Sequence, residues 1–149
     1  MIFSSGKGKI KHDPNIWDAG SEKCIRRMKI ISLSLENFRN YASCELEFAG
    51  GMNVLCGKNG AGKTNILESL YLMSLFTSPR TTKDKELVKF GAEYARVRLA
   101  IEKKFRRHTL AMQIEANGKK KVLVDGIPVK RAAELIGILG VCLLYTSPS

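Results

Sequence analysis

The sequence has few acidic side chains and lacks any long apolar run. Its 149 residues carry 14 Asp and Glu against 25 Lys and Arg, which gives a formal net charge of +11. The absence of about 18 consecutive apolar residues argues against a membrane-spanning helix. An apolar content of 44% is too high for a disordered chain. The composition therefore predicts one soluble globular domain, and its basic excess favours an acidic partner, with nucleic acid the first candidate.

The sequence also lacks the cysteine spacings of a metal or redox site. It has 4 cysteines, of which Cys44 and Cys56 lie in the part with regular periodicity, outside any metal-ligand pattern. The first residues contain no apolar core of a secretory signal peptide. These features favour a cytoplasmic protein with reduced thiols and argue against a zinc site.

The two ends of the chain differ from its middle. Residues 1–27 show no sustained period of 2 or 3.6, and periodicity begins at Met28. We interpret residues 1–27 as a non-native extension; the alternative is a flexible basic arm. Residues 142–149 resemble the translation of a sequencing-library adapter; the alternative is a short strand with a Pro-containing tail. We therefore expect the domain to comprise residues 28–141, which keep the basic excess.

Hydrophobic periodicity predicts a mixed α/β layout. Apolar residues from Ile66 to Leu75 at helical spacing predict a helix that begins at Lys63. Asp125-Gly126 predicts a tight hairpin turn. Alternation with a period of 2 predicts strands at 31–35, 44–48, 97–101, 110–114 and 122–124. We also expect a buried strand at 52–56 and a strand at 127–129. The other predicted elements are a turn at 37–42, one or two helical turns at 85–90 and a helix at 130–139. The helix is thus followed by an antiparallel meander.

One segment matches the phosphate-loop pattern G-x-x-x-x-G-K-[ST] in full: Gly57, Lys58, Asn59, Gly60, Ala61, Gly62, Lys63 and Thr64. Glycines allow successive backbone N–H groups to surround phosphate oxygens, and the start of a helix adds further donors. Lys63 suits the β- and γ-phosphates, and the hydroxyl of Thr64 suits Mg²⁺. A strand before the loop and a helix after it argue against a Gly-rich turn with an incidental lysine. ATP and Mg²⁺ are the predicted cofactors.

An acidic metal ligand on a second strand is missing. Residues 121–125 are the one segment that partly matches a Walker B strand. The Asp125-Gly126 pair fits a hairpin turn better than it fits the end of a Walker B strand. The chain is therefore expected to hold half of an ATP site and no catalytic residue, and whether it is an enzyme stays open.

With these segments in view, residues 28–141 resemble the amino-terminal part of the RecF family, ATPases of SMC/ABC type. The carrying segments are 35–41, 53–56 before the phosphate loop, 64–71 after it, and then 80–81, 84–91 and 125–130. The resemblance implies a P-loop NTPase fold of ABC/SMC type with a mixed sheet. Pro79 departs from the family, which usually has an aromatic residue there, and the signature and Walker B motifs would lie beyond residue 141.

The resemblance also implies a function and partners. It implies ATP binding, binding of single-stranded or gapped DNA, ATP-dependent homodimerisation and recombination mediator proteins as partners. The family's roles lie in recombinational repair, replication and the SOS response. In SMC-like relatives the basic residue at the position of Arg39 lies near the nucleotide, so Arg39 is a candidate phosphate contact; the alternative is a solvated turn arginine. Two other hypotheses are a small P-loop phosphotransferase and a nucleotide-binding fragment without catalysis.

Basic residues gather at two expected hairpin ends. Lys103, Lys104, Arg106 and Arg107 surround Phe105 at one end, and Lys119, Lys120 and Lys121 lie at the other. If the two ends lie together, they form one patch for DNA phosphates, and Phe105 could stack on a base. The alternative is that these charges only keep turns and sheet edges solvated.

Overall fold

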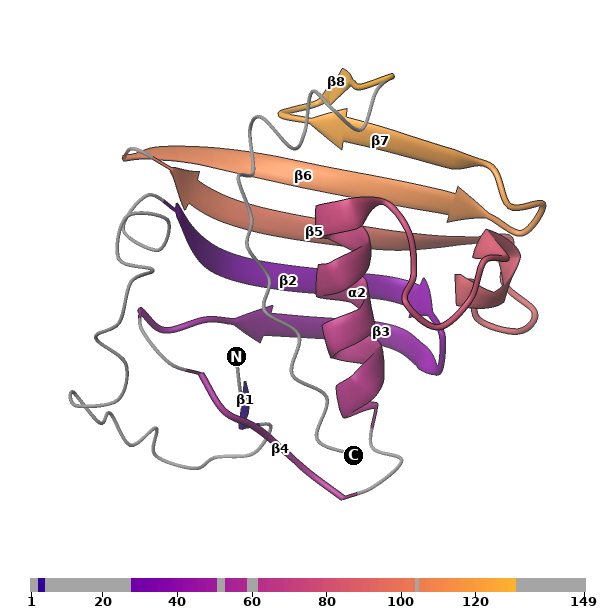
Figure 1. Ribbon diagram of the computed structural model, residues 1–149, viewed down its shortest axis with the longest axis horizontal. Coiled ribbons are helices and arrows are strands. Elements are labelled where there is room, and N and C mark those ends of the chain that lie inside the picture. Colours follow the sequence, from indigo (N-terminus) through magenta and orange to yellow (C-terminus); the bar gives the residue numbers. More distant parts are fainter. Residues whose placement is uncertain (1–2, 5–27, 51–52, 59–61, 104, 131–149) are drawn as a thin grey trace.

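The computed structural model describes residues 3–4, 28–50, 53–58, 62–103 and 105–130, and its centre is a six-stranded antiparallel sheet (Figure 1). The helix α2 (Lys63–Leu75) lies across one face of this sheet. In spatial order the strands are β3 (Tyr41–Glu47), β2 (Met28–Phe38), β5 (Tyr94–Lys103), β6 (Arg106–Glu115), β7 (Lys120–Val124) and β8 (Ile127–Pro128). A separate parallel pair joins β1 (Phe3–Ser4) to β4 (Leu55–Cys56), and a 3-10 helix, η1, covers Asp84–Leu87.

The core lies between α2 and the sheet. Cross-strand rows of apolar side chains form its floor, because every second residue of a strand points to the same face. One row is Leu33, Leu99, Leu110 and Val124, and the next is Leu35, Val97, Met112 and Val122. Helix α2 covers these rows with buried Ile66, Leu70 and Met73. This packing fixes the helix on the sheet.

The opposite face of the sheet is polar. Arg96 donates hydrogen bonds to Glu36 (3.3 Å) and Gln113 (3.1 Å), and its guanidinium lies 5.1 Å from the ring centre of Tyr94. The Tyr94 hydroxyl donates to Glu36 at 2.9 Å, and this hydrogen bond to a carboxylate raises the pKa of Tyr94. The sheet is thus apolar on the α2 side and polar on the other, which is the pattern of a half-covered antiparallel sheet.

The predicted strands, helix α2 and antiparallel meander are confirmed, with differences at their ends. The predicted turn at 37–42 is wrong in its extent, because β2 continues to Phe38 and only Arg39 and Asn40 connect it to β3. Positive φ values at Asn37 (49°) and Arg39 (53°) allow this sharp reversal. The predicted strand at 52–56 is described only as Leu55–Cys56, and Met52 lies outside the described residues.

Two predicted helical segments have different outcomes. The one or two turns expected at 85–90 are the 3-10 helix η1, which begins one residue earlier and ends at Leu87. The helix expected at 130–139 lies outside the described residues from position 131 onward, and Lys130 is in no regular element.

The hairpin turn at Asp125-Gly126 is confirmed. Positive φ values of 51° and 82° at these residues join β7 to β8 in the way that type I′ turns do. The Asp125 carboxylate accepts a hydrogen bond from the Thr109 N–H and lies 2.8 Å from His108 Nδ1. The hydrogen bond with His108, followed by that from Thr109, lowers the pKa of Asp125. Asp125 is therefore a turn residue, and the imitation of a Walker B strand is explained by the hairpin.

We expect Gly126→Ala to destabilise the fold by about 1 kcal/mol, because an L-residue is strained at this positive φ. A Cβ at Gly126 would meet no atom within 4 Å, so backbone strain is the whole cost. Gly50→Ala is the matched control, since a Cβ there also meets nothing within 4 Å and no positive φ is involved. Chemical denaturation measures both variants, and equal free energies of unfolding would contradict the assignment of the turn.

Candidate functional site

The phosphate-loop pattern joins the end of β4 to the start of α2. Gly62, with φ 87°, is the N-cap of α2, and its carbonyl accepts from the Ile66 N–H at 3.1 Å. No side chain of the described residues caps this end, and the first turn of α2 has no acidic residue. Its N–H groups and the positive end of the helix dipole are therefore available to an anion. Asn59, Gly60 and Ala61 lie outside the described residues.

The described residues of the motif converge at this end of the helix. The Lys63 ammonium donates a hydrogen bond to the Gly57 carbonyl, so it reaches back from α2 to the residue after β4. Thr64 and Lys58 are exposed. The pattern thus places a lysine, a hydroxyl and backbone donors together, which is the donor set for a polyphosphate.

Tyr41 packs directly against the N-cap of α2. A Cβ built on Gly62 would lie 2.6 Å from Cζ of Tyr41, closer than any real contact. Glycine is therefore favoured at position 62 for two reasons: the φ is positive, and a Cβ would displace the aromatic ring. Burial raises the pKa of the Tyr41 hydroxyl. Through this contact the first residue of β3 touches the phosphate-loop motif.

A buried carboxylate lies two turns further along α2. Glu68 has a side chain with no exposed surface, and Arg39 binds both of its oxygens, with Nε–Oε2 3.0 Å and Nη2–Oε1 2.7 Å. Arg80 Nη1 approaches Oε2 at 3.1 Å, and the Ser78 hydroxyl donates to Oε1 at 2.5 Å. Bidentate pairing with arginine and a further hydrogen bond are what a buried charge needs.

The ionisation of Glu68 reflects these partners. Burial alone would raise its pKa, but hydrogen bonds from Arg39 and Ser78 and the charges of Arg39 and Arg80 together lower the pKa of Glu68. The carboxylate is therefore ionised at neutral pH and holds the arginines in place.

A second polar contact links the same elements. Asn65 donates to Asn40 Oδ1 at 2.6 Å and accepts from Arg80 Nη1 at 2.7 Å. Sequence reasoning missed the roles of Glu68 and Asn65. The available signal was a glutamate at a core-facing position between Ile66 and Leu70, because such a carboxylate requires a buried cation.

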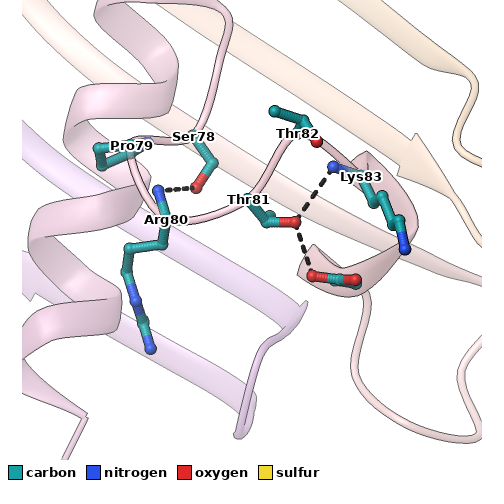
Figure 2. A pocket seen from close by; sticks show the side chains of 7 residues that line it. Ser78, Pro79, Arg80, Thr81, Thr82 and Lys83 are labelled. Atoms are coloured by element: carbon teal, nitrogen blue, oxygen red, sulfur yellow. Dashed lines mark hydrogen bonds between the residues drawn. The ribbon is translucent and has the colours of Figure 1, made fainter.

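The segment after α2 contains an open cavity of about 380 Å³ lined by residues 78–83 and Glu86 (Figure 2). Thr81 organises it: its hydroxyl donates to Glu86 Oε2 at 2.6 Å and accepts from the Lys83 N–H at 3.1 Å. Arg80 and Lys83 extend on either side of Thr81 (Figure 2). Pro79, the departure from the RecF pattern, is exposed at the rim.

The two groups of basic residues do not lie together. Lys103, Phe105, Arg106 and Arg107 are at the β5–β6 end, whereas residues 119–121 are at the β6–β7 end. Ten residues of β6 separate these ends by about 30 Å. The single joint patch that we considered is therefore ruled out by the sheet register, and Lys104 lies outside the described residues.

The two groups also differ in how their charges are used. Lys120 Nζ lies 2.9 Å from Asp84 and donates to the Phe76 carbonyl at the end of α2, and Lys121 lies 3.0 Å from Glu115. At the other end Phe105 is fully exposed with Arg106 and Arg107 beside it. The lysines at 120 and 121 are thus engaged within the protein.

The family profile described as the AAA ATPase domain matches residues 28–127, from the start of β2 to the start of β8. The chain belongs to this family. Among the described residues of this AAA ATPase domain, no helix is long and apolar enough to cross a membrane. Nor do they contain a cluster of three or more His, Cys, Asp or Glu side chains that could hold a metal.

The resemblance to RecF is confirmed. Over 121 residues the chain is 44% identical to the DNA replication and repair protein RecF of Lachnoclostridium phytofermentans, an alignment that covers 81% of this chain and 33% of that protein. The RecF of Clostridioides difficile is 43% identical over 116 residues, 78% of this chain and 31% of the relative. The chain thus spans about a third of the length of these relatives.

Solved structures confirm the predicted P-loop NTPase fold of ABC/SMC type. The recombination mediator protein RecF with ATP is similar with a TM-score of 0.69 and 36% identity, covering 74% of this chain and 31% of that one. The Smc head domain from Pyrococcus furiosus has the same fold, with a TM-score of 0.69 at 21% identity over 76% of this chain and 33% of that one.

We expect Glu68→Gln to lower stability at neutral pH by about 3 kcal/mol, because it leaves buried arginine charge without its carboxylate. Since folding lowers the pKa of Glu68, its contribution is present above the usual glutamate range and is lost as the pH falls through the lowered value. The gap in unfolding free energy between wild type and Glu68→Gln should therefore narrow toward acidic pH. Glu115→Gln, at an exposed ion pair, is the control with a smaller gap. A gap independent of pH would contradict the assignment.

Proposed function

We propose that this chain binds ATP through its phosphate loop and acts in recombinational DNA repair and replication. The observation that carries the proposal is the uncapped N-terminus of α2 with Lys63 and Thr64 at its start, directly after β4. Helix N–H donors, a lysine and a hydroxyl match the β- and γ-phosphates of a nucleotide. The similarity to RecF, including one solved with ATP, supports ATP as the nucleotide.

Mg²⁺ fits this site as the companion of ATP. Thr64 offers one exposed hydroxyl oxygen, and the described residues beside it add no cluster of acidic ligands. Mg²⁺ is typically held by few protein groups together with substrate phosphates. We therefore assign Thr64 as the protein ligand of Mg²⁺ that arrives with the nucleotide.

DNA is the proposed macromolecular partner, in single-stranded or gapped form. The β5–β6 end is the better candidate surface, because Phe105 is fully exposed there and Arg106 and Arg107 are exposed beside it. An aromatic ring flanked by cations can stack on a base and neutralise phosphates. By similarity to RecF we extend the proposal to ATP-dependent homodimerisation, recombination mediator partners, a role in the SOS response and a cytoplasmic location.

Lys63→Ala should weaken ATP binding at least tenfold, because it removes the charge on the β- and γ-phosphates, an interaction of about 1.5–3 kcal/mol. Calorimetric titration of the full chain with Mg-ATP measures the affinity. Lys85→Ala, an exposed lysine on η1, is the matched control and should bind like wild type. Unchanged affinity of Lys63→Ala would remove the phosphate-loop assignment.

Replacing Arg106 and Arg107 with alanine should weaken binding of single-stranded DNA and reduce its salt dependence. The slope of log affinity against log salt should fall by about 0.7 for each DNA phosphate that the variant no longer neutralises. Lys121→Ala should have a smaller effect, since Glu115 already pairs with this lysine. Arg98→Ala, at an exposed position within β5, is the neutral control. Fluorescence anisotropy over a salt series measures all four proteins, and equal slopes would contradict the assigned surface.

A further inference from the structure

The turn between β2 and β3 contacts α2 in an ordered way. Consecutive residues 39, 40 and 41 contact residues 68, 65 and 62 of α2 and its N-cap, in that order. Positions three apart are neighbours on a helix surface. The three helix positions therefore lie on one face of α2, within a rise of about 9 Å. The turn thus runs antiparallel along the first two turns of the phosphate-loop helix.

The three contacts use different chemistry. Arg39 makes the bidentate pair with buried Glu68, Asn40 accepts from the Asn65 amide, and the Tyr41 ring packs on Gly62. A bidentate ion pair restricts both distance and angle. The ring occupies the space that a Cβ at the N-cap would need, so a larger residue there would force the ring to shift. Together these contacts fix the position of α2 along its axis, relative to the turn, and its rotation about that axis.

The turn is itself anchored on the other side. The Arg39 N–H donates to the Leu87 carbonyl at 2.9 Å, and the Lys89 N–H donates to the Asn37 carbonyl at 2.8 Å. Arg39 Nη1 donates to the Glu86 carbonyl at 3.0 Å. The segment from η1 to residue 89 therefore holds the turn, and the turn holds the helix.

The contacts of Arg39 bear on its role. Nε, Nη1 and Nη2 each donate to an acceptor within the protein, and the side chain is 19% exposed. Of the five N–H donors of its guanidinium, three are used here, and two of these satisfy a buried carboxylate, so Glu68 and the Glu86 carbonyl fix the position of the Arg39 side chain.

We propose that Arg39 is a positioning residue, which acts on the nucleotide through Glu68, and that the turn 39–41 sets the position of the phosphate-loop helix. This rests on the proposed ATP binding. Lys63 and Thr64 lie between Gly62 and Asn65, so the contacts of Tyr41 and Asn40 bracket the two side chains assigned to the phosphates and Mg²⁺. A small displacement of a correctly placed group is enough to cost much of its interaction.

A double-mutant cycle in the full chain separates this role from direct contact. We expect Arg39→Ala and Glu68→Gln each to weaken Mg-ATP binding about tenfold and the double variant also about tenfold, because the two residues act as one unit. If Arg39 contacts phosphate directly, Arg39→Ala should weaken binding even in the Glu68→Gln background. The double variant would then bind Mg-ATP about a hundredfold more weakly than wild type. An additive result would overturn the proposal.

Two controls separate positioning from stability. Arg96→Ala breaks the ion pair with Glu36 on the far face of the sheet and should leave ATP affinity unchanged at a temperature where every variant is folded. If Arg39→Ala lowers only the melting temperature and binds ATP like wild type, the proposal is wrong. If circular dichroism shows that Arg39→Ala does not fold, Asn40→Ala takes its place, because the contact of Asn40 with Asn65 is exposed. We then expect Asn40→Ala to bind Mg-ATP about threefold more weakly than wild type. Binding with wild-type affinity would overturn the proposal.

Wild type and Lys63→Ala are measured in the same series. Failure of wild type to bind ATP, or indifference to Lys63→Ala, would overturn the proposed function and the positioning role with it. Lys63-dependent binding combined with an additive cycle would overturn the positioning role alone.

Discussion

The buried carboxylate of Glu68 is the constraint on which the candidate site depends. An ionised group with no exposed surface in a helix of Leu, Ile and Met is strongly destabilising unless cations and donors surround it. Arg39, Arg80 and Ser78 supply these partners from a turn and a loop that are distant in sequence. Because the charge needs all of them, α2, the β2–β3 turn and the loop after α2 take fixed positions relative to one another.

The ion pairs of Glu68 restrict the position of α2 more tightly than apolar packing does. The contacts of Ile66, Leu70 and Met73 hold α2 on the sheet, but apolar contacts are non-directional and tolerate small sliding and rotation. Hydrogen bonds with defined geometry remove that freedom. A phosphate site at a helix N-terminus benefits, since its donors are useful only when they point at the phosphate oxygens. The polar network lies near the start of α2, where it fixes the direction of the N–H donors of the phosphate loop.

Local patterns predicted much of the fold, and the limits of that prediction are physical. Alternation identified β2, β5 and β6, and the Asp125-Gly126 pair identified its turn, because both signals are contained in a few adjacent residues. The separation of residues 103–107 from 119–121 follows from the length of β6 between them, which is ten residues, whereas the alternation predicted a strand only over 110–114. The partners of Glu68 are 29 and 12 residues away, so sequence showed a glutamate in an apolar helix without showing what neutralises it. The His108–Asp125 contact was missed for the same reason.

The location of the basic residues changes the meaning of the net charge. A charge of +11 suggests a broadly cationic surface, but several of these cations are used inside the fold. Arg39 and Arg80 neutralise Glu68, Lys120 binds Asp84 and the Phe76 carbonyl at the C-cap of α2, and Arg96 pairs with Glu36. An arginine that compensates a buried carboxylate cannot also attract a phosphate at full strength, because its field is already cancelled nearby. Among the described cations, Lys58 beside the phosphate loop and Arg106 and Arg107 at the β5–β6 end are exposed. Under the proposed DNA binding, we therefore expect the affinity to depend more on where the exposed arginines lie than on the total charge.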